Sequence, residues 1–259
     1  MRPDGSAFDA VPGPSPPEVE RNVIDIERDA FARSTARDGW LALAYYLAYL
    51  AYLFRRPENE LVHWFSMVLV PLVIAGLALP RGRRVLREAL ASVGLRRGNL
   101  RKGIGWAVLA GGVITVFQVF AGGRADAIQA LFRSGRALWL FPFAFAVMLE
   151  LAGFTEEFLF RGFIQTRLEP LLRSRWAAVL VTALLFGVYH LPYAYLNPQW
   201  PSHGDWGAAW LAALGNGVPG GLLLGALYVF SRGNLLACVV LHALNNAAPA
   251  MTLIHFGGG

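Results

Sequence analysis

Long apolar runs separated by short polar segments make up most of this chain. After a polar first stretch the runs span residues 40–54, 61–79, 103–121, 137–154, 176–191, 207–230 and 234–256. A helix needs about 20 apolar residues, with a range of about 17–25, to cross the hydrocarbon core of a bilayer. The pattern therefore predicts seven membrane-spanning helices, of which the first and the fifth must borrow flanking residues.

The segment 155–173 differs from these runs because it is amphipathic. Its charged residues are Glu156, Glu157, Arg161, Arg167 and Glu169, with Arg173 at its end. The pattern predicts a helix that spans the membrane, enters and leaves on one side, or lies at the interface. We therefore expect an all-α fold, a polytopic transmembrane bundle of about seven to eight helices.

Composition and charge support a membrane protein. Hydrophobic residues make up 56% of the chain and charged residues 15%, whereas soluble proteins are typically about 25% charged. The basic residues that give the net charge of +6 lie mostly between apolar runs, so no nucleic-acid partner is expected. The single cysteine, Cys238, excludes an internal disulfide and a cysteine-based metal site.

The distribution of basic residues predicts the orientation in the membrane, because short loops rich in Arg and Lys stay in the cytoplasm. Segment 80–102 holds seven arginines and one lysine, and segment 192–206 holds none. Three apolar runs separate these segments, which places the N-terminus in the cytoplasm if 155–173 is not a span of its own. The arginine-rich usage favours a bacterial cytoplasmic membrane as the location.

The chain shows no repeat of fixed period, and no loop is long enough to form a soluble domain. Residues 1–38 are polar and rich in proline at their start. We expect them to form a largely disordered cytoplasmic tail. Residues 39–259 are then a single membrane-embedded domain.

A pair of glutamates in the sequence EEFLFRG is the first candidate for chemistry, since charged residues in apolar helices often mark function. Glu157 and Arg161 are four residues apart and share a helix face. Glu156 points about 100° away from Glu157. We expect Arg161 to neutralise Glu157 and leave Glu156 free to act as a general base. An ordinary ion pair on a solvated face is the alternative.

Two histidine motifs are the other candidates. In FGVYH, Phe186 precedes His190 by four residues, although a histidine at the end of a span is often only an interfacial residue. In HALNN, His242 and Asn246 lie four residues apart on one face in the middle of an apolar run. Hydrogen bonds between packed helices are the alternative explanation for that pair.

Two features near these motifs predict supporting contacts. Glu150 lies seven residues before Glu157, so on an unbroken helix it shares that face and is a candidate contact of Arg161. The glycines of GNGVPGGLLLG, residues 215–225, predict close helix packing or a kink near the site.

Together the motifs EExxxR, FxxxH and HxxxN, in this order on successive helices, resemble those of the CPBP family. This family contains the type II CAAX prenyl proteases and bacteriocin-processing enzymes, also known as Abi proteins. The resemblance covers about residues 143–249, and every polar motif position matches. It implies an intramembrane endopeptidase of the glutamate type.

The resemblance also implies roles for the motif residues. Glu156 would activate a water molecule, with His190 sharing or orienting the proton transfer. The neighbouring glutamate–arginine pair would hold the helix and the charge balance. His242 and Asn246 would stabilise the oxyanion that forms when water attacks a peptide carbonyl.

No cofactor is required by this interpretation. The family is often labelled metalloprotease, and Glu156, His190 and His242 are the residue types of a catalytic zinc site. The chain lacks an HExxH motif, however, and its two histidine candidates are 52 residues apart. We therefore favour water activation without metal.

The expected partners are the lipid bilayer and a membrane-associated peptide or protein substrate. In a bacterium this would be a peptide precursor, a C-terminal sorting tag or a regulatory membrane protein, rather than the prenylated CAAX proteins of eukaryotes. One alternative is a non-catalytic scaffold or immunity protein that binds a partner through the same helices. A second is a small transporter, which would need an inverted repeat that the sequence does not show.

Overall fold

The computed structural model describes residues 35–55, 60–77, 85–95 and 100–254. Residues 1–34 of the expected tail lie outside these ranges, as do the C-terminal residues from 255 onward. The first described helix, α2 (Ala36–Leu53), begins before the expected domain boundary at residue 39. The described residues contain helices and no strands, so the fold is all-α as predicted.

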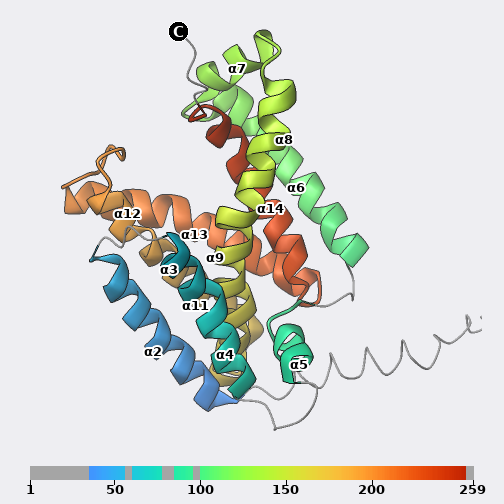
Figure 1. Cartoon of the computed structure of the whole chain (residues 1–259), viewed down its shortest axis with the longest axis vertical. Coiled ribbons are helices and arrows are strands. Elements are labelled where there is room, and N and C mark those ends of the chain that lie inside the picture. The colour runs from blue at the N-terminus through green and yellow to red at the C-terminus, as the bar shows by residue number, and fades with distance from the viewer. Residues whose placement is uncertain (1–34, 56–59, 78–84, 96–99, 255–259) are drawn as a thin grey trace, which may run out of the picture.

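The elements follow the apolar runs of the sequence closely. After α2 they are, in chain order, α3 (Glu60–Trp64), the π-helical segment η1 (Phe65–Leu69), α4 (Val70–Leu77), α5 (Val85–Ser92), α6 (Leu100–Ala121), α7 (Ala125–Arg133), α8 (Ala137–Met148), η2 (Leu149–Phe154), α9 (Thr155–Glu157), η3 (Phe158–Gln165), α10 (Thr166–Leu172), α11 (Arg175–Tyr189), α12 (Leu191–Leu196), α13 (Trp206–Phe230) and α14 (Leu235–Met251). Figure 1 shows them as a bundle in which α9 and η3 lie near the centre.

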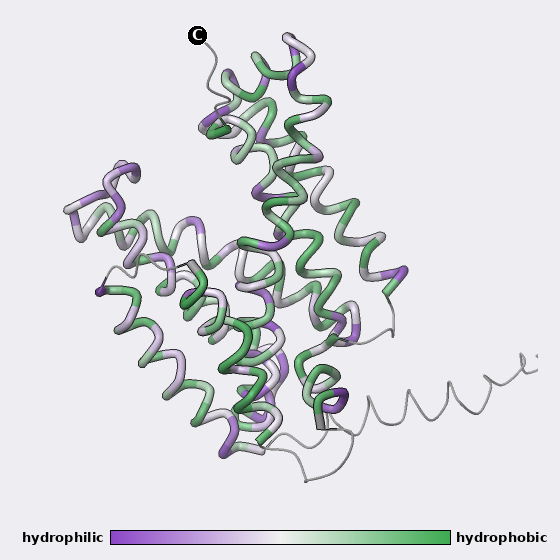
Figure 2. Tube along the Cα trace, viewed as in Figure 1, coloured by the Kyte–Doolittle hydropathy of each residue, from purple (hydrophilic) through white to green (hydrophobic). Residues whose placement is uncertain are grey.

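Several helices have the length and composition of membrane spans. In the part of the chain that the structure describes, four are long and apolar enough to cross a bilayer: Leu100–Ala121, Ala137–Leu172, Arg175–Leu196 and Trp206–Phe230. Two shorter apolar helices, Leu61–Leu77 and Leu235–Met251, accompany them. The outer face of α6 exposes large apolar side chains, including Val113, Phe117 and Phe120. Figure 2 shows such apolar residues along the helices, so the chain is a multi-pass integral membrane protein.

The ambiguous segment 155–173 is not a separate helix. It continues α8 through η2, α9, η3 and α10 as one helical run from Ala137 to Leu172. A run of 36 residues is at most about 54 Å long, which exceeds the roughly 30 Å thickness of the hydrocarbon core. Because the run does not reverse, its two halves cannot be antiparallel spans. The odd number of crossings that the orientation argument requires is thereby retained.

Two short amphipathic helices, α5 and α7, are absent from the sequence-based prediction. The backbone N–H of Leu235 donates to the carbonyl of Gly94, which follows α5, at 3.0 Å. At the other end of the bundle the side chain of Gln129 in α7 donates to the carbonyl of Val119 at 2.9 Å. Five of the eight basic residues in segment 80–102 lie outside the described ranges.

The centre of the bundle is formed by η3, in which every residue from Phe158 to Gln165 is buried. Around it, α11 packs along α13, α14 packs along α6 and α8, and α2 packs against α10. Arg161 of the EExxxR motif lies in this buried segment, and Glu156 and Glu157 lie directly before it in α9. The two histidine motifs lie on α11 and α14, which both contact this helical run.

Candidate active site

A buried ion pair anchors the site. Arg161 donates from Nη1 to Glu157 Oε1 at 2.8 Å, and both side chains are fully inaccessible to solvent. Arg161 also donates from Nη2 to the carbonyl oxygen of Gly221 on α13 at 3.2 Å. Its guanidinium carbon lies 4.4 Å from the centroid of the Phe186 ring on α11. The structure therefore contains the pair that the i, i+4 spacing predicts, and this pair ties three helices together.

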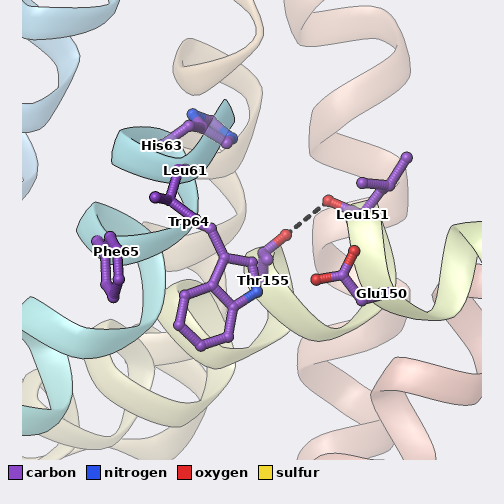
Figure 3. A pocket seen from close by; sticks show the side chains of 7 residues that line it. All are labelled: Leu61, His63, Trp64, Phe65, Glu150, Leu151 and Thr155. Carbon is purple, nitrogen blue, oxygen red and sulfur yellow. Dashed lines mark hydrogen bonds between the residues drawn. The ribbon is translucent and has the colours of Figure 1, made fainter. Parts of the chain in front are cut away.

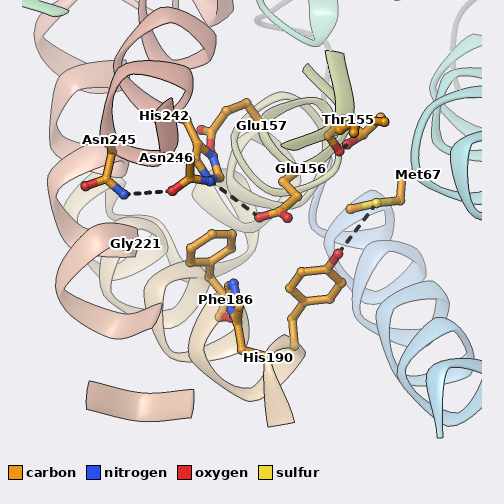
Figure 4. A network of polar contacts seen from close by, with 12 residues as sticks. Met67, Thr155, Glu156, Glu157, Phe186, His190, Gly221, His242, Asn245 and Asn246 are labelled. Carbon is orange, nitrogen blue, oxygen red and sulfur yellow. Dashed lines mark hydrogen bonds and ion pairs between the residues drawn. The ribbon is translucent and has the colours of Figure 1, made fainter. Parts of the chain in front are cut away.

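His242 of α14 connects the two neighbouring glutamates. Its Nδ1 lies 2.7 Å from Glu157 Oε1, and its Nε2 lies 3.8 Å from Glu156 Oε2. Because an ionised carboxylate can only accept a hydrogen bond, Nδ1 carries the proton in the contact with Glu157. Figure 4 shows the imidazole between the two carboxylates. The nitrogen that remains for chemistry, Nε2, faces Glu156.

Glu156 has the more accessible of the two carboxylates. Its side chain is 14% exposed, whereas that of Glu157 is 0% exposed. The Oε2 atoms of both glutamates are buried without a hydrogen-bond partner among the described residues, but only Glu157 is also bound through Oε1, by Arg161 and His242. A buried carboxylate oxygen normally has such a partner. The geometry thus separates a neutralised glutamate from one that is free to bind a further group.

His190 lies at the edge of this cluster rather than in contact with Glu156. Its Nδ1 donates to the carbonyl oxygen of Phe186 at 2.7 Å, which leaves Nε2 free in the neutral ring. The Phe186 ring lies between the histidines, with ring centroids 4.7 Å from His190 and 5.9 Å from His242. Within the described ranges no hydrogen bond or ion pair joins His190 to Glu156.

Asn246 lies one helical turn after His242 on α14. Its Oδ1 accepts a hydrogen bond from Nδ2 of Asn245 at 3.0 Å. This contact uses the carbonyl oxygen of the amide, so the NH₂ group of Asn246 is the part that remains to donate. Figure 4 shows Asn246 beside His242, on the side of the cluster formed by α14.

The expected contact between Glu150 and Arg161 is not formed. Arg161 is bound by Glu157 and Gly221, whereas Glu150 lines a cavity with residues of α3 and η1. The physical reason is η2, whose π-helical hydrogen bonds join residues five rather than four apart. Seven residues then no longer make two turns, and Glu150 is rotated away from the face of Glu157.

The glycines of α13 allow the close helix packing that the sequence predicts. A Cβ atom at Gly221 would lie 2.8 Å from the Cα of Ala183 on α11. At Gly217 it would lie 2.6 Å from the Cα of Gly187. This contact brings the carbonyl of Gly221 within reach of Arg161, so the glycines help to build the site.

A group of tyrosines lies next to the site, and the sequence alone does not predict it. The hydroxyl of Tyr189 lies 3.4 Å from that of Tyr193 and 3.8 Å from the sulfur of Met67. The hydroxyl of Tyr49 on α2 lies 2.8 Å from Nδ1 of His63. Tyr49 and Tyr189 occur inside apolar runs, where an aromatic side chain is ordinarily part of the core, and Tyr193 directly follows one, so no sequence signal distinguishes them.

The candidate zinc ligands do not converge. His242 and His190 each use Nδ1 on an acceptor of the protein, as zinc-bound histidines also do, but the Phe186 ring lies between the two imidazoles. Across the described ranges, no three His, Cys, Asp or Glu residues are grouped so as to hold a metal ion. The side chains as arranged therefore do not fit a His, His, carboxylate zinc centre.

The fold and the site together define a class of protein. It is a multi-pass helical membrane protein in which separate helices contribute buried glutamate, arginine and histidine side chains. Residues 137–248 match the model of a family described as Type II CAAX prenyl endopeptidase Rce1-like. This segment of the chain is therefore similar to that family, which supports the resemblance seen in the motifs. Comparison with curated proteins and with solved structures gave no match. All three motifs lie inside the matched segment.

Proposed function

We propose that the protein is an intramembrane endopeptidase that hydrolyses a peptide bond of a membrane-associated peptide or protein, with Glu156 activating the water. One observation carries this proposal: His242 lies between two adjacent glutamates, of which only Glu157 is neutralised by Arg161. The family match supports a CAAX-protease-like peptidase. The chemistry assigned to individual side chains is our inference.

In the proposed reaction, Glu156 takes a proton from water while the water oxygen attacks the carbonyl carbon of the substrate. The C=O double bond becomes a single bond to an oxyanion. Glu156 then returns the proton to the amide nitrogen as the C–N bond breaks, which yields an amine and a carboxylic acid. A single carboxylate thus acts first as base and then as acid, and the charge of the site is the same after the reaction as before it.

His242 and Asn246 are the proposed donors to the oxyanion. Glu157 holds the Nδ1–H of His242, as the buried carboxylate holds the histidine of a catalytic triad, so the ring orientation is fixed. When Nε2 is protonated it can donate to the developing charge, together with the NH₂ group of Asn246. His190, across the Phe186 ring, is proposed to orient the substrate or water at the edge of the site.

The proposal is tested by replacing Glu156 with its uncharged isostere. Purified wild type and Glu156→Gln are incubated in detergent micelles with a proteome-derived peptide library, and new peptide termini are read by mass spectrometry. Removal of a general base typically lowers the rate about 10²- to 10⁴-fold, so Glu156→Gln is expected to lose nearly all cleavage. Glu169→Gln, a carboxylate near the far end of the same helical run, is the matched control and keeps full activity.

Cleavage by Glu156→Gln at the wild-type rate would contradict the proposal. It would favour the alternative of a membrane scaffold or immunity protein that binds a partner without cleaving it. A zinc chelator added to the wild type is expected to change the rate less than about twofold, while a loss of more than tenfold that zinc restores would show that a metal takes part.

A further inference from the structure

A cavity beside the site has no role in the proposed mechanism. It has a volume of about 430 Å³ and lies between α3 with η1 on one side and η2 on the other. Residues that line it include Leu61, His63, Trp64, Phe65, Glu150 and Thr155. Figure 3 shows Glu150 and Trp64 facing each other across it.

Glu150 is an acidic residue in an apolar part of the long helical run, 13 residues after its start at Ala137. A charged side chain at such a position costs a few kcal/mol on insertion scales, and it is usually paired. Among the described residues, however, no hydrogen bond or ion pair binds the Glu150 carboxylate, which is exposed. The nearby His63 is already bonded through Nδ1 to the hydroxyl of Tyr49 at 2.8 Å. The carboxylate is therefore available for a cation from outside the chain.

Trp64 provides the second half of a cation-binding site. The face of a tryptophan ring attracts ammonium and guanidinium groups more strongly than the other aromatic side chains do. A carboxylate adds a charge-assisted hydrogen bond to the same group. Leu61 and Phe65, which also line the cavity, are apolar and suit the methylene stem of a long basic side chain.

The cavity is close to Glu156, because its lining residue Thr155 is the immediate neighbour of that glutamate. Glu156 lies six positions after Glu150, which corresponds to at most about 9 Å along a helix. An extended peptide covers that distance with about three residues. A peptide whose scissile bond lies at Glu156 can therefore place a side chain in the cavity. That side chain belongs to a residue within about three positions of the scissile bond.

We propose that this cavity is a specificity pocket that binds a lysine or arginine side chain of the substrate, between the Glu150 carboxylate and the Trp64 ring. The basic residue lies within about three residues of the bond that is cleaved. The inference rests on the proposed function, and it adds the class of substrate: a peptide with a basic residue next to its cleavage site.

The test uses the bonds cleaved by the wild type in the peptide library. Their sequences are expected to be enriched in lysine or arginine at one position within three residues of the cleaved bond. The best-cleaved lysine peptide is then compared with a version that carries norleucine instead. Glu150→Gln should lower kcat/KM for the lysine peptide about 10- to 100-fold and leave the norleucine peptide within about twofold.

Charge reversal gives a gain of function that loss of folding cannot imitate. Glu150→Lys is expected to prefer a peptide with glutamate at the same position over the lysine peptide. Trp64→Phe should keep part of the preference for lysine and Trp64→Leu should lose more of it, because only the former retains an aromatic face. Glu169→Gln is the control, and its cleavage profile should equal that of the wild type.

The results that would reject the specificity pocket differ from those that would reject the proposed endopeptidase. If the wild type cleaves the lysine and norleucine peptides equally, or if Glu150→Gln slows both equally, the cavity does not read a basic side chain. The endopeptidase then stands, provided that Glu156→Gln is inactive. Wild-type cleavage no greater than that of Glu156→Gln would reject the endopeptidase and the specificity pocket together.

Discussion

Glu156 and Glu157 are adjacent in the sequence, but their surroundings differ because successive side chains on a helix point in different directions. Glu157 faces the interior of the helical bundle, where Arg161 and Nδ1 of His242 bind it. Glu156 faces the other ring nitrogen of that histidine and keeps a small exposed surface. In the proposed mechanism, this difference in direction gives one carboxylate a structural role and the other the role of general base.

The buried pair predicts a stability effect that depends on both partners. Arg161→Met leaves Glu157 buried without its cation, and breaking a buried pair in this way costs about 3–5 kcal/mol in the free energy of unfolding. The double variant Arg161→Met with Glu157→Gln should be less destabilised than the sum of the single variants, because no unpaired charge remains. Unfolding in detergent, followed by circular dichroism, measures the difference. Strictly additive losses would show that the two side chains do not interact.

At the same scale, sequence alone predicts contacts that depend only on helical spacing. The pair of Glu157 and Arg161 is of this kind. The link from His242 to both glutamates joins residues 85 and 86 positions apart, and no local pattern encodes it. The environment of Glu150 could not be predicted, because no sequence pattern indicates the π-helical segment η2, which rotates Glu150 away from Arg161.

At the scale of elements, the apolar runs predict where helices lie but not where one helix stops. The pattern changes from apolar to amphipathic at Thr155, and this change suggested a new helix. In the structure the helical run that begins at Ala137 continues through Thr155 to Leu172 without ending. Short helices such as α5 and α7 fall between the runs, and their amphipathic character is too brief to be recognised.

Close contact between α11 and α13 makes a prediction about single glycines. Gly221→Ala would place a methyl group 2.8 Å from the Cα of Ala183 and 3.2 Å from its carbonyl oxygen, so the helices must separate. Overpacking of this kind typically costs about 1–3 kcal/mol, and it also moves the carbonyl that Arg161 binds. Both the thermal midpoint and the cleavage rate should fall. The neighbouring Gly220→Ala, which meets nothing within 4 Å, should change neither.

At the scale of the whole molecule, contacts between distant segments define two ends of the bundle. At one end, Arg167 of α10 donates to the carbonyl oxygen of Ser92, the last residue of α5, at 2.8 Å, and Gly39 at the start of α2 packs against α10. At the other end, Arg124 before α7 donates to the hydroxyl of Thr252 after α14 at 2.7 Å. The first end also carries residues 85–95, the described part of the basic segment, so the proposed orientation places this end in the cytoplasm.

This orientation predicts which turns a reagent can reach from each side of the membrane. The only native cysteine, Cys238, is buried and gives little background. Arg175→Cys marks the turn between α10 and α11 at the first end, and Ser134→Cys marks the turn after α7 at the other end, both at exposed positions. In intact cells a membrane-impermeant maleimide should label Ser134→Cys at once, and Arg175→Cys only after the membrane is opened. The reverse pattern would place the N-terminus outside. Labelling of both variants in intact cells would mean that the two turns share one side, which an odd number of crossings between them forbids.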